Sequence, residues 1–99
     1  MRPIHTARLD MVRPVVVLTR EIVRPHMARV IVAPVTTTIR GLSTEVPVGT
    51  ANGLSQASVV SCDNIVTVPK SALGEQIGHL LPSQELALSK AIQAAFDLE

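Results

Sequence analysis

The segment Arg13-Pro14-Val15-Val16-Val17-Leu18-Thr19 decides the fold of this 99-residue chain. Its four consecutive apolar residues, three of them β-branched, predict a strand that is buried on both faces. Pro14 cannot donate a hydrogen bond to a neighbouring strand and suits the first position of a strand. We therefore expect Arg13 to lie just outside the sheet, held by a rigid neighbour.

A second apolar run, Val30–Val35, ends in the hydroxyl cluster Thr36-Thr37-Thr38. Pro34, near the end of this run, predicts an edge strand or a bulge because proline has no N–H for a ladder. If the two apolar strands pair, an arginine and a threonine meet at one end of a small sheet. We expect the function of the protein to lie there.

Short apolar runs separated by turn residues continue along the chain. The clearest turn is Gly49–Gly53, because it contains Asn-Gly. Besides the two central strands, the pattern predicts strands at Pro3–Leu9, Thr44–Val48, Ser58–Ser61, Ile65–Val68 and Gln76–Leu81.

The one helix that we expect covers Pro82–Phe96, with Ser83 as its N-cap. Apolar residues at helical spacing give it one buried stripe, made of Leu88, Ile92, Ala95 and Phe96. The chain is therefore expected to be mainly β (α+β), with five to seven short strands and a C-terminal helix. This pattern is typical of a small barrel or rolled sheet, and the length predicts one domain over residues 1–99.

Composition restricts the functional classes. Aromatic residues make up 1% of the chain, which argues against a protein that stacks bases on an aromatic platform. Cys62 is the single cysteine, so no intrachain disulfide forms, which suits a reducing cytosol. We expect this thiol to be buried rather than nucleophilic. No apolar run has the length of a signal peptide or a membrane span, so a cytoplasmic protein without a membrane partner is expected.

Charge is distributed unevenly along the chain. Residues 1–40 hold seven arginines and two acids, a formal charge of +5, whereas residues 41–99 hold two lysines and six acids, a formal charge of −4. A basic half indicates either a polyanionic partner or ordinary solvated loops. Arginine in preference to lysine favours bidentate recognition of phosphate.

Arg13 and the threonine cluster offer what cleavage of an RNA phosphodiester needs. A fixed cation offsets charge that grows on the phosphate, and a hydroxyl donates to a non-bridging oxygen. The 2′-hydroxyl of the RNA can be the nucleophile, so neither a protein nucleophile nor a metal is required. The alternative is that Arg13 is an exposed residue at a strand end and that the threonines are ordinary strand residues.

Other polar residues give weaker signals. His5, His26 and His79 lack the spacing of metal ligands, although a two-histidine acid–base ribonuclease stays open as an alternative. Asp63-Asn64 has the side chains to read base edges, and the alternative is that the pair simply makes a bend.

The order of these segments resembles a known family. Arg13–Thr19, then Val30–Thr36, then Ser58–Val60 leading to Asn64–Val68, and finally a terminal helix, resemble the MazF/PemK toxins of type II toxin–antitoxin systems. The whole-chain pattern, including Arg2-Pro3-Ile4-His5, is most similar to the mycobacterial MazF toxins.

The resemblance implies an SH3-like barrel, a homodimer and an endoribonuclease that needs no metal or other cofactor. It implies cleavage of single-stranded mRNA, rRNA or tRNA at short sequences, with 2′,3′-cyclic phosphate and 5′-hydroxyl products. The catalytic arginine and threonine of the family fall on Arg13 and Thr36, and we expect Thr37, Asp63 and Asn64 to contact RNA. The implied protein partner is a cognate MazE-type antitoxin with an acidic, disordered tail.

The sequence departs from the family pattern at positions that bear on which RNA sequence is cut and which residues contact RNA. The long loop of many relatives is replaced here by Asp10-Met11-Val12, and Asn64 stands where glutamine is common. One alternative is a non-catalytic toxin of the same fold that binds DNA gyrase, similar to CcdB. Another is a small RNA- or protein-binding barrel without catalysis.

Overall fold

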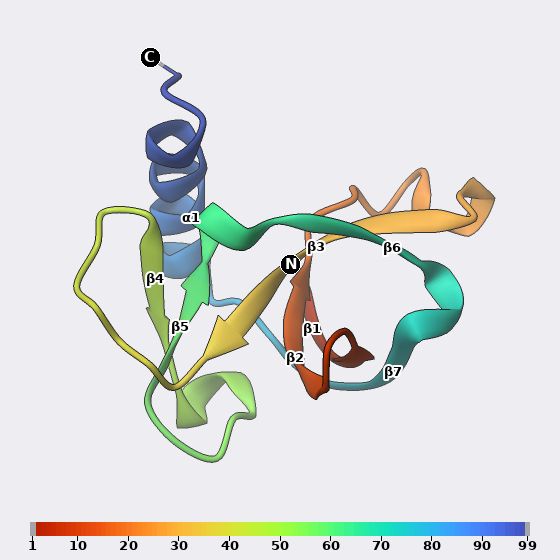
Figure 1. Ribbon diagram of the computed structural model, residues 1–99, viewed down its shortest axis with the longest axis horizontal. Helices are drawn as coiled ribbons and strands as arrows, with labels where there is room; N and C mark the ends of the chain where they lie inside the picture. Colours follow the sequence, from red (N-terminus) through yellow and green to blue (C-terminus); the bar gives the residue numbers. More distant parts are fainter. Residues whose placement is uncertain (1, 99) are drawn as a thin grey trace.

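Seven strands and one helix make up the computed structural model, which describes residues 2–98 (Figure 1). In chain order they are β1 (Pro3–Arg8), β2 (Val12–Val17), β3 (Arg29–Thr36), β4 (Glu45–Val48), β5 (Ser58–Ser61), β6 (Val66–Pro69), β7 (Leu73–His79) and α1 (Pro82–Ala95). The mainly β fold with a C-terminal helix is confirmed. The last strand begins at Leu73 rather than at the predicted Gln76, because a short 3-10 turn over Lys70–Ala72 leads straight into it.

β3 lies at the centre of the sheet, whose strand order is β4-β5-β3-β2-β1-β7. One edge of β3 pairs with β2. The other edge pairs with β6 from Arg29 to Val32 and then with β5 at Val35 and Thr36. Pro34 falls between these two partners, so its missing N–H interrupts no pairing along that edge. Pro34 therefore lies where β3 changes its partner from β6 to β5, and not at the predicted edge position or bulge.

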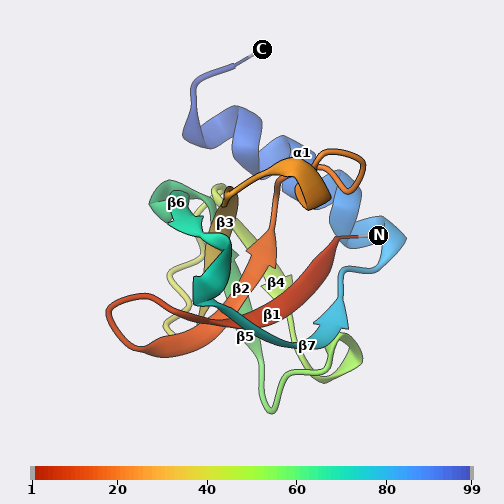
Figure 2. The same ribbon diagram turned by 90° about the vertical axis from the view of Figure 1, so that its right-hand side faces the viewer.

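The sheet rolls up because β6 continues through the Lys70–Ala72 turn into β7, which pairs with β1. β3, β2, β1, β7 and β6 thereby form a ring (Figures 1 and 2). The apolar cluster within this ring takes residues from β1, β2, β3 and β6, and consists of Ala7, Val15, Val17, Val30, Val32 and Val68. A second cluster lies between the other face of the sheet and α1, and includes Ile4, Val16, Ala33, Val60, Leu88 and Ala91.

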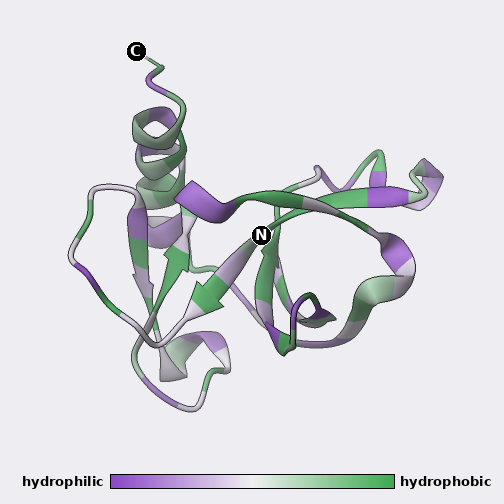
Figure 3. Cartoon of the chain, viewed as in Figure 1, coloured by the Kyte–Doolittle hydropathy of each residue, from purple (hydrophilic) through white to green (hydrophobic). Residues whose placement is uncertain are grey.

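The predicted two-sided burial of the central strand is confirmed. Val15 and Val17 belong to the cluster within the ring, and Val16 belongs to the cluster under the helix. Each of the three is at most 1% exposed, which corresponds to about 1.5–3 kcal/mol of transfer free energy per side chain. In Figure 3 much of β2 carries the apolar colouring.

The expectation that Arg13 lies outside the sheet was wrong. β2 begins at Val12, and Arg13 and Pro14 are paired strand residues opposite Ala7 and Thr6 of β1. The connection between β1 and β2 is so short that the two strands stay paired as far as Arg8 and Val12. Pro14 is tolerated inside the strand because the pairing of β2 with β3 begins only at Val15, which leaves its other edge free.

The predicted helix is present, but its two ends differ from the prediction. α1 starts at Pro82, and the N-cap is Leu81 rather than Ser83. The side chain of Gln84 caps the helix instead, because its Oε1 accepts the Leu81 N–H at 2.9 Å. Phe96 lies beyond the last helical residue and is 57% exposed, so the expectation that it is buried was wrong. Within residues 2–98, no helix has the length and apolar character needed to span a membrane.

Candidate active site

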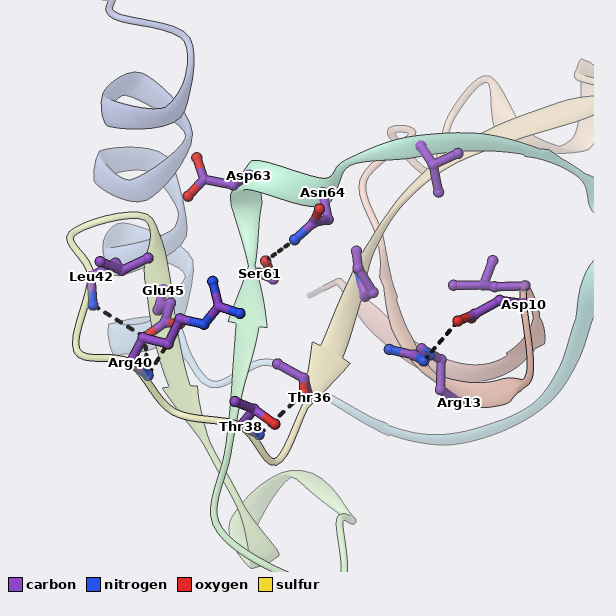
Figure 4. Close-up of a pocket in the computed structure, with 13 residues that line it drawn as sticks. Asp10, Arg13, Thr36, Thr38, Arg40, Leu42, Glu45, Ser61, Asp63 and Asn64 are labelled. Carbon is purple, nitrogen blue, oxygen red and sulfur yellow. Dashed lines mark hydrogen bonds and ion pairs between the residues drawn. The ribbon is translucent and has the colours of Figure 1, made fainter.

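A pocket of about 620 Å³ opens where β3 ends, between β2 and the segment that joins β3 to β4 (Figure 4). β2 contributes Arg13, and β3 contributes Pro34 and Thr36. The segment that joins β3 to β4 closes one side, and the 3-10 turn after β5 closes another. The complete lining consists of Leu9, Asp10, Arg13, Pro34, Thr36, Thr38, Arg40, Leu42, Glu45, Ser61, Asp63, Asn64 and Val66.

Arg13 enters this pocket with most of its hydrogen-bond donors unused. Its Nη2 donates to Asp10 Oδ2 at 3.2 Å, whereas its Nε is buried and has no partner. Asp10 is in turn held by the Met11 N–H, which donates to Oδ1 at 3.0 Å. Since a guanidinium carries five N–H donors, Arg13 is oriented by Asp10 and still has donors left for an oxyanion.

Thr36 has a fixed hydroxyl whose hydrogen is free. Its Oγ1 accepts the N–H of Thr38 at 3.1 Å, which holds the side chain in a local turn. Because the hydroxyl acts as an acceptor in this contact, its own hydrogen remains available to a ligand in the pocket. Arg13 and Thr36 therefore present donors to the same cavity from two neighbouring strands, as the sequence predicts.

Asp63 and Asn64 line the pocket from the 3-10 turn over Cys62–Asn64. Asn64 Nδ2 donates to Ser61 Oγ at 2.8 Å, which leaves the amide oxygen open. Asp63 Oδ2 accepts the Thr44 hydroxyl at 2.6 Å, and Figure 4 shows the Asp63 carboxylate directed away from Asn64. Where the sequence predicts a bend, the chain makes a 3-10 turn after the end of β5. Beyond this turn it runs along β3 as β6.

Thr37 is separated from the other predicted site residues. β3 ends at Thr36 and the chain bends at Thr37, so that Thr36 and Thr38 line the pocket and Thr37 does not. Thr37 instead lines a different hollow of about 340 Å³, together with Pro14 and Gln56. A role for Thr37 in RNA binding stays a prediction, and this pocket gives it no support.

Arg40 and Glu45 are pocket residues that the sequence did not reveal. Glu45 Oε1 accepts the backbone N–H groups of Arg40, Gly41 and Leu42 at 3.1, 2.8 and 3.1 Å. These bonds fold the loop so that the Arg40 side chain reaches into the pocket (Figure 4). Only Gly41, with a φ of 74°, carries a local signal for this loop.

The pocket is not basic as a whole. Arg13 and Arg40 face the carboxylates of Asp10, Glu45 and Asp63, which gives the lining a formal charge of −1. Each of these three carboxylates already accepts at least one hydrogen bond. The pocket therefore provides directed donors at fixed positions and no broad positive field.

In the described part of the chain, neither a thiol nucleophile nor a pair of histidines nor a cluster of metal ligands lines this pocket. Burial, reinforced by Asp63, raises the pKa of the Cys62 thiol to about 11, so the thiol is neutral and unreactive near pH 7. Its predicted burial is confirmed. No histidine lines the pocket, and within residues 2–98 no three His, Cys, Asp or Glu side chains are grouped as metal ligands would be.

Comparison with known proteins agrees with this geometry. The family model of the PemK-like, MazF-like toxin of type II toxin–antitoxin systems matches residues 3–96. Endoribonuclease MazF3 of Mycobacterium tuberculosis is 66% identical over 99 residues, which cover 100% of this chain and 96% of that protein.

Solved structures give the same result. The Mycobacterium tuberculosis toxin MazF-mt6 superimposes with a TM-score of 0.97 at 65% identity, covering 99% of both chains. An endoribonuclease from a mycobacterial species, in complex with its cognate antitoxin, has a TM-score of 0.87 at 26% identity and covers 98% of this chain and 93% of its own. The chain therefore belongs to the PemK-like, MazF-like toxins of type II toxin–antitoxin systems.

Proposed function

We propose that this MazF-type toxin, an endoribonuclease, cuts single-stranded RNA at short sequences without a metal ion and so inhibits translation and growth. One observation carries the proposal: Arg13 and Thr36 present free donors to one pocket from neighbouring strands. This is the arrangement that a phosphate needs when negative charge grows on its oxygens.

The proposed reaction uses the RNA as its own nucleophile. The 2′-oxygen forms a bond to phosphorus and loses its proton to solvent, while the bond from phosphorus to the 5′-oxygen breaks and that oxygen gains a proton from solvent. Arg13 clamps a non-bridging oxygen and stays protonated throughout, and Thr36 donates its hydroxyl hydrogen to the same phosphate. Asp10 holds the guanidinium in position. The products are a 2′,3′-cyclic phosphate and a 5′-hydroxyl end.

The pocket wall opposite Arg13 is the proposed site of sequence recognition. The free amide oxygen of Asn64 accepts from base N–H groups, and the carboxylate of Asp63 adds a second acceptor at the rim. Both residues follow a buried strand, so their backbone positions are fixed relative to Thr36.

The proposed unit is a single toxin domain over residues 1–99 that acts in the cytoplasm as a homodimer. An antitoxin of the MazE type is the proposed protein partner, and the solved complex of a related mycobacterial endoribonuclease with its cognate antitoxin supports this. Exposed apolar side chains beside the pocket, Ile39 at 55% and Leu42 at 47%, offer contact area to a partner.

The direct test is incubation of cellular RNA with the protein in EDTA, followed by sequencing of fragments that carry 5′-hydroxyl ends. We expect cleavage at one short sequence by the wild type and none by Arg13→Ala or Thr36→Ala. Arg8→Ala and Thr67→Ala are matched controls, because both residues are exposed and lie outside this pocket. Intact RNA with the wild type, together with inhibited gyrase supercoiling, would favour the CcdB-like alternative; binding without cleavage would favour a non-catalytic barrel.

A further inference from the structure

Four cations gather at the end of β3 that is opposite the pocket. Arg20 and Arg24 lie in the β2–β3 connection, Arg29 starts β3, and Lys70 follows β6. We call these four residues the basic tip. Lys70 Nζ donates to the carbonyl oxygen of Arg24 at 3.0 Å, and the Lys70 N–H donates to Ala28 O at 2.9 Å. These bonds bring together residues that are far apart in the sequence.

The cations of the basic tip are not neutralised. Among residues 2–98 the ion pairs are Arg2–Glu85 and Arg13–Asp10, and neither involves the tip. Glu21 is the one acid in the β2–β3 connection, so the four cations and this acid carry a formal charge of +3. Arg20, Arg29 and Lys70 are exposed, and Arg24 is half-buried.

The pocket lacks the attraction that the tip provides. Its lining has a formal charge of −1, and a net negative charge does not attract a polyanion from solution. Base stacking on aromatic rings cannot supply the affinity either, because Phe96 is the sole aromatic residue and follows the C-terminal helix. Cations outside the pocket are therefore the groups that can supply electrostatic attraction for RNA.

We infer that the basic tip binds the phosphate backbone of RNA that flanks the cleaved site. This inference rests on the proposed ribonuclease function. β3 places the two sites about 23 Å apart, since seven residue steps separate Arg29 from Thr36. The substrate is thus an RNA long enough to reach both ends of β3. The preference for arginine over lysine in the tip suits bidentate contact with phosphate oxygens.

The test measures binding alone, so its result does not depend on cleavage. A labelled oligouridylate long enough to span both sites is titrated by fluorescence anisotropy over a series of NaCl concentrations. We expect Arg20→Gln/Arg29→Gln to weaken binding about tenfold at physiological salt and to reduce the slope of log K against log[NaCl] by about 1.4, because each phosphate contact adds about 0.7. A short oligouridylate that fits only the pocket should show little of this change.

Arg8→Gln/Lys90→Gln removes the same charge from other exposed positions and should leave the slope close to that of the wild type. Equal losses in both double variants would overturn the inference, because net charge alone would then explain the binding. The inference would also be overturned if Arg20→Gln/Arg29→Gln left RNA binding unchanged but abolished competition by polyglutamate. The surface would then be assigned to an acidic protein. If the wild type binds RNA through the tip but does not cleave it, the proposed function fails and the tip remains an RNA-binding surface without a cleaved site.

Discussion

The two ends of β3 hold arginines in opposite surroundings. At the C-terminal end, Arg13 lies in a pocket, is paired with Asp10, and faces the fixed hydroxyl of Thr36. At the N-terminal end, Arg29 belongs to an exposed group of cations that pairs with no carboxylate among residues 2–98. The pocket has restrained geometry and a small negative charge, whereas the tip has positive charge that is carried mostly by exposed side chains.

This difference separates two requirements of an RNA-cutting protein. Stabilising charge on a phosphate requires donors at fixed positions, because donors that must reorganise during the reaction contribute less. Attracting RNA from solution requires net positive charge, and the exact positions of the cations matter little. Changes in the pocket should therefore alter the rate constant at saturating RNA, and changes in the tip should alter KM and its dependence on salt.

The largest expected effect comes from replacing the same residue type at the two ends. Arg13→Ala should lower kcat by about 10²–10³-fold, because it removes the donors that face the phosphate. Arg29→Ala should raise KM a few-fold and change kcat much less. Single-turnover and steady-state cleavage of one RNA by both variants measures the contrast. Similar losses in kcat for the two variants would erase the distinction between the two ends.

The next effect concerns Thr36, which lines the pocket, and its neighbour Thr37, which lines a different hollow. Thr36→Val removes the pocket hydroxyl at nearly constant volume and should lower kcat about 10²-fold. Thr37→Val changes a residue outside the pocket and should alter kcat by no more than about twofold. If Thr37→Val is as harmful as Thr36→Val, RNA also passes over the hollow that Thr37 lines.

Alkaline pH should destabilise the protein through the buried thiol of Cys62, which is next to the pocket residue Asp63. The pKa of Cys62 is raised from 9.0 to about 11 in the folded protein, so above pH 9 the unfolded chain loses this proton first. The stabilisation is complete below pH 9 and is lost as the pH rises through 11, by roughly 2–3 kcal/mol in total. Urea unfolding at a series of pH values, with Cys62→Ala as the reference, measures this term. Parallel pH profiles for the two proteins would contradict it.

The smallest effect tests how Arg40 is held in the pocket. Glu45→Gln weakens three hydrogen bonds from the 40–42 backbone and should cost about 1–2 kcal/mol of stability. We expect a fall in Tm of about 5–10 °C and a several-fold loss of kcat/KM. Glu75→Gln, at an exposed position of β7, is the matched control. An unchanged Tm would show that the loop does not depend on this carboxylate.

The apolar runs made most of the sheet predictable. Val15–Val17 is buried on both faces, and Val30–Val35 is buried except at Ile31, which is 43% exposed. The pairing of these two strands places Arg13 and Thr36 at one pocket. The separation of Thr37 from Thr36 had no such signal, because it arises from a bend just after β3. The Ser83 cap was wrong because Gln84 makes the capping contact from inside the helix.

Other features depended on contacts between distant residues. Arg40 reaches the pocket because Glu45 accepts three backbone N–H groups of a loop, and no local pattern announces such a bond. The basic tip forms because Lys70 contacts Arg24 across 46 positions. The charge skew of the N-terminal half was visible in the sequence, but its concentration at one end of β3 required the pairing of β3 with β6.

A double-mutant cycle on Arg13→Ala and Thr36→Val tests the central claim most directly, with kcat for one RNA measured under single-turnover conditions. Two donors that act on the same phosphate should be strongly coupled, so the double variant should be little slower than Arg13→Ala alone. Losses that multiply fully in the double variant would mean that the two residues act independently, and the shared phosphate site would be excluded.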